Sequence, residues 1–176
     1  MIFEKTLLDG AFMVRIQPRE DERGLFARTF CRDEFSINGL PGSFVQCSVS
    51  WNRLAGTLRG LHFQRQPHAE GKLVRCTMGA AYDVIVDLRP HSETYCRWLS
   101  FELTANNRMG VYVPPGFAHG FQTLTAETEI FYQMTETYSA ESAAGVRWND
   151  PAFGIEWPLP VASITDRDAL YPDFVK

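Results

Sequence analysis

Short apolar runs, separated by turn residues at close spacing, make up most of this chain. Runs rich in β-branched or aromatic residues predict strands over residues 11–18, 24–30, 43–50, 56–64, 72–78, 80–90, 97–104, 109–114, 118–124 and 128–135. Glycine, proline or asparagine lies between most of these runs, as is typical of turns that join strands. The pattern favours an antiparallel sandwich or barrel over an alternation of strands and helices.

The segments outside these runs have other patterns. Residues 32–40 (RDEFSINGL) predict a short helix that ends at Gly39, and residues 163–171 (SITDRDALY) predict a helical turn. Residues 19–24 (REDERG) are expected to form a polar turn between two strands. Residues 145–160 contain too much proline and glycine for regular structure, so we expect an irregular flap that lies on the sheets.

Length and composition fit one globular domain over residues 1–176. The chain is 45% hydrophobic and 22% charged, which is ordinary for a soluble protein with a real core. Its formal net charge of −4 argues against a general nucleic-acid or anionic-membrane surface, but not against a locally basic pocket. No run approaches the roughly 20 apolar residues that span a bilayer, and the first residues lack the basic region of a signal peptide. We therefore expect a cytoplasmic protein.

The cysteines indicate neither a disulfide framework nor a zinc site. They stand at positions 31, 47, 76 and 96, with no C-x-x-C pair and no zinc-finger spacing. We interpret them as isolated, buried thiols in a reducing compartment.

Two of the four histidines interrupt apolar strands. His62 lies in GLHFQ and His119 in GFAHGF, whereas His68 and His91 lie in polar loops. A lone histidine on a strand is more often structural than functional, but two of them beside glycines and near basic residues favour a functional site. A barrel that binds iron or manganese usually offers H-x-H, and this chain has Gln64 at the second position. Two histidines without a well-placed carboxylate make a poor divalent site, so we expect no metal.

Basic side chains accompany His62 on the predicted strands. Arg59 lies on the same strand and Lys72 begins the next one, so a shared pocket could bind phosphate and hold an imidazole that moves protons. Strict alternation places Arg59 and His62 on opposite faces. Both reach one pocket only if the strand bulges, which we expect at Gly60. Arg75 is interpreted as part of a solvated strand face.

Eight segments, in order and over nearly the whole chain, resemble the dTDP-4-dehydrorhamnose 3,5-epimerases. They are DERGLFARTF, FVQCSVS, GTLRGLHFQ, GKLVRC, VYVPPGFAHGFQTL, FYQMTETYS, VRWNDPAFGIEWP and DRDA. The resemblance implies an all-β cupin jelly roll (a double-stranded β-helix) with a few short helices, a homodimer, and a site without metal or other cofactor. It also implies inversion at C3 and C5 of dTDP-4-dehydro-6-deoxy-D-glucose, which gives dTDP-4-dehydro-L-rhamnose in dTDP-L-rhamnose biosynthesis.

The resemblance assigns roles to single residues. His62 matches the base, and Asp168 matches the carboxylate that orients its ring. Tyr132 matches the acid on the opposite face, and Lys72 matches a lysine that would lie near the developing enolate oxygen. Further residues match positions that contact nucleotide, phosphate or sugar, with the tyrosine stacking on thymine: Arg23, Gln46, Arg59, His119, Tyr138 and Arg167. If the dimer exchanges strands, Arg23 would reach the partner's pocket.

Several positions depart from the family pattern. Ser48 stands where members have asparagine, and Ala143 stands where some have glutamate. Some members have lysine in place of Arg167 and an acid near Arg28. These changes concern the ligand-contacting rim and leave the proton-transfer residues intact, so they bear on which nucleotide sugar is bound and not on the type of reaction.

Alternatives remain open from the sequence. A relative that inverts only C3 or only C5, or that acts on another 4-keto deoxysugar nucleotide, would share the same residues. A metal-dependent cupin oxygenase or isomerase is disfavoured by the missing H-x-H, and a non-catalytic nucleotide-sugar binder by the presence of both base and acid. Tyr132 could also be a core tyrosine, and Arg167 a solvated tail residue.

Overall fold

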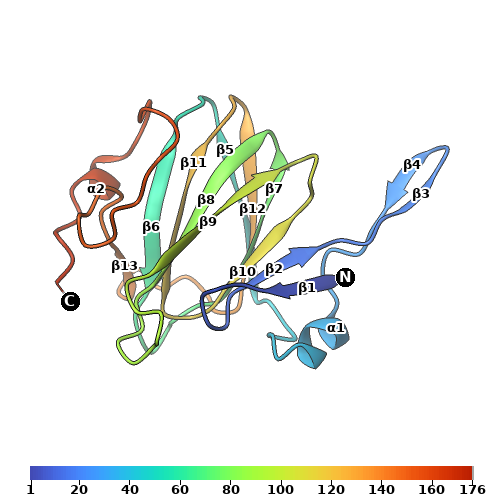
Figure 1. Ribbon diagram of the computed structural model, residues 1–176, viewed down its shortest axis with the longest axis horizontal. Helices are drawn as coiled ribbons and strands as arrows, with labels where there is room; N and C mark the ends of the chain where they lie inside the picture. The colour runs from blue at the N-terminus through green and yellow to red at the C-terminus, as the bar shows by residue number, and fades with distance from the viewer. Residues whose placement is uncertain (176) are drawn as a thin grey trace.

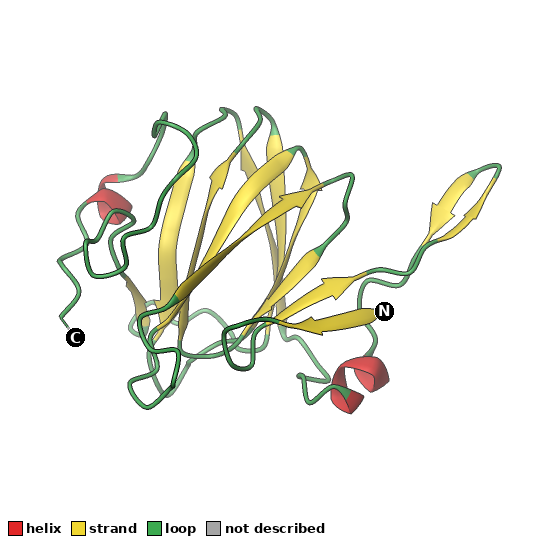
Figure 2. Cartoon of the chain, in the orientation of Figure 1, coloured by secondary structure: helices red, strands yellow, loops and turns green. Residues whose placement is uncertain are grey.

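Two antiparallel sheets face each other in the computed structural model, which describes residues 1–175 (Figures 1 and 2). In spatial order, the six-stranded sheet contains β1 (Ile2–Lys5), β2 (Phe12–Arg15), β10 (Gly110–Val113), β7 (Lys72–Met78), β12 (Thr128–Met134) and β5 (Gln46–Asn52). The five-stranded sheet contains β13 (Ala143–Gly145), β6 (Leu58–Gln64), β11 (Phe117–Thr123), β8 (Ala80–Asp87) and β9 (Trp98–Thr104). This arrangement confirms the predicted all-β jelly roll.

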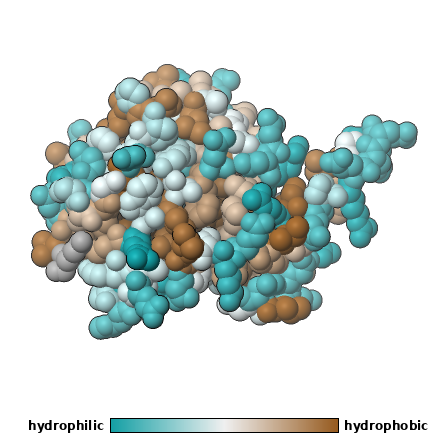
Figure 3. Space-filling view, viewed as in Figure 1, coloured by the Kyte–Doolittle hydropathy of each residue, from teal (hydrophilic) through white to brown (hydrophobic). Residues whose placement is uncertain are grey.

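Two strands and two helices lie outside these sheets. β3 (Arg19–Asp21) and β4 (Gly24–Phe26) pair as a hairpin that projects from the body, and its surface is mainly hydrophilic in Figure 3. α1 (Arg32–Ile37) and α2 (Asp166–Ala169) are the two short helices that the sequence predicts. Among residues 1–175, no helix is long and apolar enough to cross a membrane.

The projecting hairpin corrects the sequence prediction for this region. Residues 19–24 were expected to be a turn, but Arg19–Asp21 is itself a strand, paired with Gly24–Phe26. The following strand was expected to run to residue 30, and it ends at Phe26. Both strands are exposed on both faces. Arg19–Asp21 consists of charged residues alone, so it lacks the apolar alternation on which a sequence prediction of strands depends.

The main core lies between the sheets, because alternate side chains of each strand point toward the opposite sheet. Val74 on β7 and Ile130 on β12 meet Ile85 on β8 and Phe121 on β11. Each of these four side chains is at most 1% exposed. Inward-facing positions on several of the same strands carry polar side chains, and these side chains form the candidate site.

A different segment covers the outer face of each sheet. Phe35 of α1 packs beside Leu73 on the outer face of the six-stranded sheet. Phe153, in the loop that follows β13, packs with Val84 on the outer face of the five-stranded sheet. Most of residues 145–160 is irregular, as expected. The strand β13 was not predicted, because its sequence, Ala-Ala-Gly, has no strand preference and pairs only through its backbone.

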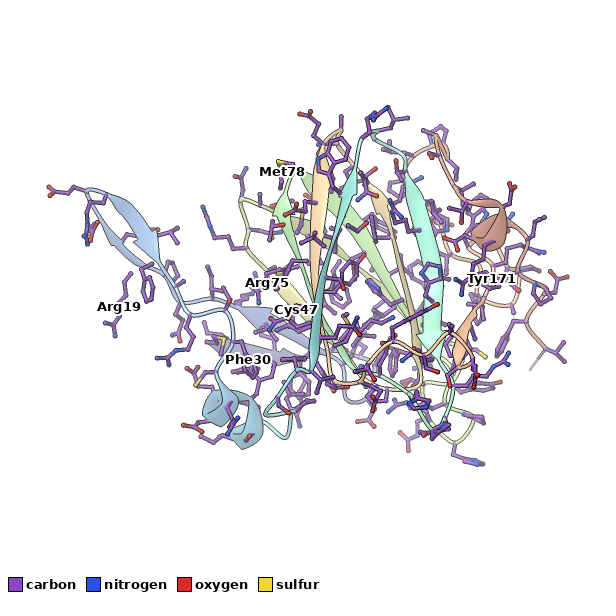
Figure 4. The ribbon with its side chains drawn as sticks, turned by 180° about the vertical axis from the view of Figure 1, so that it is seen from behind. Arg19, Phe30, Cys47, Arg75, Met78 and Tyr171 are labelled. Carbon is purple, nitrogen blue, oxygen red and sulfur yellow. The ribbon has the colours of Figure 1, made fainter. Side chains whose placement is uncertain are left out.

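Arg75 is buried, so the prediction that it belongs to a solvated strand face is wrong. Its side chain lies on the outer face of β7, near Phe30 in the view of Figure 4, and the residue is 7% exposed. Its Nη2 donates a hydrogen bond to the carbonyl oxygen of Thr29 at 2.9 Å. Burial lowers the pKa of this guanidinium. Arg75 thus ties the segment that leads out of the hairpin to the sheet.

The four cysteines are free thiols, as expected, but only one of them is buried. Cys76 points into the core, and its burial raises the pKa of the thiol to about 11. Cys47 is exposed on the outer face of β5 (Figure 4), and Cys31 and Cys96 are partly exposed. The prediction of buried thiols therefore holds for Cys76 alone.

Asp87 ends β8 as a fully buried carboxylate, and we expect it to make stability depend on pH. Burial would raise the pKa of Asp87, but hydrogen bonds from Arg89, Ser92 and Thr94 outweigh burial and lower it to about 2. A carboxylate with a lowered pKa stabilises the folded state above its unfolded pKa and loses that effect as the pH falls.

Replacement by asparagine, Asp87→Asn, should therefore lower the free energy of unfolding by about 2 kcal/mol at pH 7. The difference from wild type should shrink below about pH 4 and be mostly lost near pH 2. Urea unfolding across this range would measure it. A difference that does not change with pH would contradict the prediction.

Candidate active site

A cavity of about 430 Å³ lies between the two sheets and brings together most of the predicted site residues. It is bounded by side chains from β6 and β11 on the five-stranded sheet and from β5, β7 and β12 on the six-stranded sheet. The predicted residues that line it are Gln46, Arg59, His62, Lys72, His119, Tyr132, Tyr138 and Arg167. Asp168 lies directly behind His62.

His62 and Asp168 form a hydrogen-bonded pair at this cavity. His62 Nε2 lies 2.7 Å from Asp168 Oδ1, and Asp168 Oδ2 accepts a hydrogen bond from the Gly60 N–H at 3.0 Å. The Asp168 side chain is 5% exposed and that of His62 is 41% exposed. Burial alone would raise the pKa of Asp168, but the bonds from His62 and Gly60 outweigh burial and hold the pKa below its usual value. Asp168 is therefore a carboxylate at neutral pH and accepts a hydrogen bond from the Nε2–H of His62.

A bulge at Gly60 brings Arg59 and His62 into the same cavity, as the sequence predicts. His62 lies opposite His119, and Arg59 lies opposite Phe121, so two residues of β6 face a single residue of β11. Gly60 has a φ of +114°, and a Cβ there would lie 2.7 Å from the Cα of Gly120. Only glycine fits this backbone conformation and this close approach.

Tyr132 and Lys72 approach the cavity from the six-stranded sheet, which faces His62. Burial raises the pKa of the Tyr132 phenol far above its usual value, and the negative charge of Asp83 raises it further. The phenol therefore stays protonated at neutral pH. Lys72 Nζ lies 3.0 Å from Glu70 Oε1, and both side chains are 11% exposed. Glu70 thus holds the ammonium group in place at the edge of the cavity.

A second histidine–carboxylate pair, His119 with Asp83, includes a residue that the sequence prediction missed. His119 Nε2 lies 2.7 Å from Asp83 Oδ2, and the two side chains are 4% and 0% exposed. Asp83 stands in the apolar strand AAYDVIVD. A charged residue in the middle of a strand that is otherwise mostly apolar was the signal that could have identified it.

The remaining predicted contacts lie around the rim. Arg59 Nε donates to Asn52 Oδ1 at 2.7 Å, and Gln46 Oε1 accepts a bond from the Tyr138 N–H at 2.8 Å. Tyr138 is 60% exposed at the cavity, so an aromatic ring is available there for stacking. Arg167 Nε donates to the hydroxyl of Tyr171 at 3.0 Å.

Arg23 is the predicted site residue that does not lie at this cavity. It follows β3 in the turn of the projecting hairpin, where it pairs with Asp21 at 2.6 Å and its side chain is 85% exposed. Within one chain it therefore does not contact the other predicted residues. Ser48 and Ala143, the two positions that depart from the family pattern, do line the cavity.

No group of three or more histidine, cysteine, aspartate or glutamate side chains within residues 1–175 is arranged to hold a metal ion. The chemistry that this arrangement itself offers is acid–base chemistry between two walls. One wall carries an imidazole with a carboxylate behind it, and the other carries a protonated phenol and an ammonium group.

Comparison with known proteins agrees with this geometry. A family described as dTDP-4-dehydrorhamnose 3,5-epimerase matches residues 5–176. An enzyme of that name from Sinorhizobium fredii is 43% identical over 98% of this chain and 89% of its own length. The structure of such an epimerase from Bacillus anthracis, with TDP and PPi bound, has a TM-score of 0.95 and 40% identity, and covers 98% of this chain and 99% of that one.

More distant relatives share the fold as well. The structure of a 3'-monoepimerase from Streptomyces bikiniensis, in complex with dTDP-quinovose, has a TM-score of 0.89 at 29% identity and covers 97% of this chain and 86% of that one. The family match nevertheless extends over almost all of the sequence, with a relative above 40% identity along it. This chain belongs to the dTDP-4-dehydrorhamnose 3,5-epimerase family.

Proposed function

We propose that this protein inverts C3 and C5 of dTDP-4-dehydro-6-deoxy-D-glucose and produces dTDP-4-dehydro-L-rhamnose, a step of dTDP-L-rhamnose biosynthesis. The enzyme is an isomerase of the epimerase type. The observation that carries the proposal is the pair His62–Asp168 on one wall of a cavity whose facing wall carries Tyr132 and Lys72. Membership of the epimerase family supports it.

His62 is the base in this proposal. Both C3 and C5 adjoin the C4 ketone, so removal of either proton leaves an enolate. Because Asp168 accepts a hydrogen bond from Nε2–H, Nδ1 carries the free lone pair of the neutral ring and takes the proton from carbon. The Asp168 carboxylate then stabilises the imidazolium that forms.

Tyr132 is the acid, and its place on the facing sheet gives the inversion. The phenol donates its proton to the enolate carbon from the side opposite His62, so the configuration changes. Its raised pKa keeps the proton on the phenol until the enolate takes it. Lys72, held by Glu70, is the cation for the developing charge on O4, where a preorganised charge typically lowers a barrier by about 3 kcal/mol.

The rim residues suit a nucleoside diphosphate. Arg59 and Arg167 offer guanidinium groups for the phosphate oxygens, and Tyr138 offers an exposed ring for the base. The B. anthracis structure, with TDP and PPi bound, supports this reading of the rim. The hydrogen bond from the Tyr138 N–H to Gln46 holds the backbone from which this ring projects.

Proton NMR in D2O with dTDP-4-dehydro-6-deoxy-D-glucose tests the reaction. Deuterium at both C3 and C5, together with inversion at both carbons, is the expected result. Deuterium and inversion at one carbon alone would make the protein a monoepimerase, and the similarity to the Streptomyces bikiniensis 3'-monoepimerase gives that outcome a structural precedent. No exchange at either carbon would contradict the proposed activity.

We also propose that the protein acts as a homodimer in the cytoplasm. Apolar side chains are exposed on the outer face of β5 and on β4, notably Val49 at 62%, Trp51 at 45% and Phe26 at 77%. A second copy on this side would cover them and could bring the Arg23 hairpin to the partner's cavity. Light scattering should give a mass of about twice 20.0 kDa, and a mass of 20.0 kDa would contradict the dimer.

A further inference from the structure

The inner faces of three neighbouring strands bring Asp83, His119 and Tyr132 together. Asp83 lies between the inward-facing core residues Ala81 and Ile85 on β8, and His119 lies two residues from inward-facing Phe121 on β11. Tyr132 lies two residues from inward-facing Ile130 on β12 of the facing sheet. The three side chains thus meet inside the sandwich, where His119 and Tyr132 line the cavity and Asp83 lies behind His119.

Contacts link the three side chains in order. Asp83 Oδ2 holds His119 Nε2 at 2.7 Å. The ring of His119 meets the ring of Tyr132 edge-on, with centroids 6.0 Å apart and planes at 79°. The position of the His119 ring therefore limits the positions open to the phenol, and Asp83 determines the position of the His119 ring.

The hydrogen bond to His119 satisfies only one of the two carboxylate oxygens of Asp83. The residue is 0% exposed, and its Oδ1 makes no hydrogen bond with any of residues 1–175. A buried carboxylate with one oxygen unsatisfied costs stability. Its negative charge opposes ionisation of Tyr132, whereas Arg59 and the Ser50 hydroxyl favour ionisation. A buried, unsatisfied carboxylate oxygen that is kept next to a proposed catalytic residue is a candidate for a functional role.

We propose that Asp83 is a positioning residue that holds the His119 ring against Tyr132, and so aims the phenol at the face of the sugar opposite His62. The inference rests on the proposed epimerase mechanism. After each inversion the phenolate regains a proton from solvent, which restores the phenol for inversion at the second carbon.

The proton balance of each inversion shows what Asp83 affects. The C–H bond breaks as His62 takes the proton, and its electron pair enters the enolate. The new C–H bond forms on the other face as the O–H bond of Tyr132 breaks, and His62 later releases its proton to solvent. If Tyr132 is misplaced, His62 returns a proton to its own face, and the result is exchange without inversion.

The test measures the ratio of inversion to exchange in D2O by proton NMR, with dTDP-4-dehydro-6-deoxy-D-glucose as substrate. In Asp83→Asn, which keeps the shape and removes the charge, we expect this ratio to fall at least about tenfold, because a well-placed general acid contributes about a hundredfold or more. Asp87→Asn is the matched control. It removes an equally buried carboxylate from the same strand, away from the cavity, and should leave the ratio at the wild-type value.

A purely structural role for Asp83 would lower both rates together and leave the ratio unchanged, and that result would overturn the inference. If Asp83→Asn does not fold, His119→Phe supplies the test, because it keeps a ring beside Tyr132 and removes the bond to Asp83. We expect the same fall in the ratio, and a wild-type ratio in His119→Phe would overturn the inference. Failure of wild type to exchange or invert would instead contradict the proposed function, and the role of Asp83 with it.

Discussion

Replacing His62 by asparagine is expected to abolish both deuterium exchange and inversion, with each rate reduced about a thousandfold. Asparagine keeps a polar group near Asp168 but has no basic nitrogen to take a proton from carbon. Because every later step needs the enolate, exchange at C3 and C5 should fall together with inversion. Proton NMR in D2O would follow both.

His91→Asn is the matched control for this experiment. His91 lies in an exposed turn, and its replacement should leave both rates unchanged. Thermal unfolding of both variants would show whether the fold is retained, which we expect because the His62 side chain is 41% exposed. Exchange at the wild-type rate in a folded His62→Asn variant would exclude His62 as the base.

Replacing Tyr132 by phenylalanine is expected to separate exchange from inversion. The variant keeps the ring that packs against the core and His119, and it loses only the hydroxyl. His62 can still remove a proton and return a deuteron on its own face, so exchange with retention should continue. Inversion should fall about a hundredfold to ten-thousandfold, which is the usual range for loss of a general acid.

The stereochemistry of the deuterated sugar is the measurement that decides this prediction. Recovered substrate labelled at C3 and C5, with little product, is the expected pattern. Tyr112→Phe provides the control, because Tyr112 is a core tyrosine at 4% exposure that does not line the cavity. Undiminished inversion in Tyr132→Phe would show that another group delivers the proton.

The variants of His62, Tyr132 and Asp83 together separate the roles of base, acid and positioning residue. Loss of the base removes all chemistry, and loss of the acid leaves exchange alone. Loss of the positioning carboxylate should give an intermediate pattern, with exchange kept and inversion weakened. The ratio of inversion to exchange should therefore fall further in Tyr132→Phe than in Asp83→Asn. That result would support Tyr132 as the acid and Asp83 as the residue that positions it.

Much of the fold could be read from local pattern, since strands with one buried face alternate apolar and polar residues. The strand predicted over residues 72–78 coincides with β7, and others differ by a few residues at their ends. The apolar pattern gave wrong predictions where a strand has no buried face, or where a segment distant in sequence covers a residue. The hairpin β3–β4 is exposed on both faces, β13 pairs only through its backbone, and Arg75 is covered by the segment around Thr29.

Neighbouring residues in the sequence are enough to predict the chemistry of β6: an imidazole and a guanidinium on one strand, with a glycine between them that permits a bulge. That bulge is predictable from local sequence, because strict alternation over a few residues would place Arg59 and His62 on opposite faces. The carboxylate that pairs with each histidine could not be predicted in this way, because it comes from a distant part of the chain. Asp168 is separated from His62 by 106 residues and Asp83 from His119 by 36. Such contacts depend on how the strands pair and how the sheets face each other, and no local pattern contains that information.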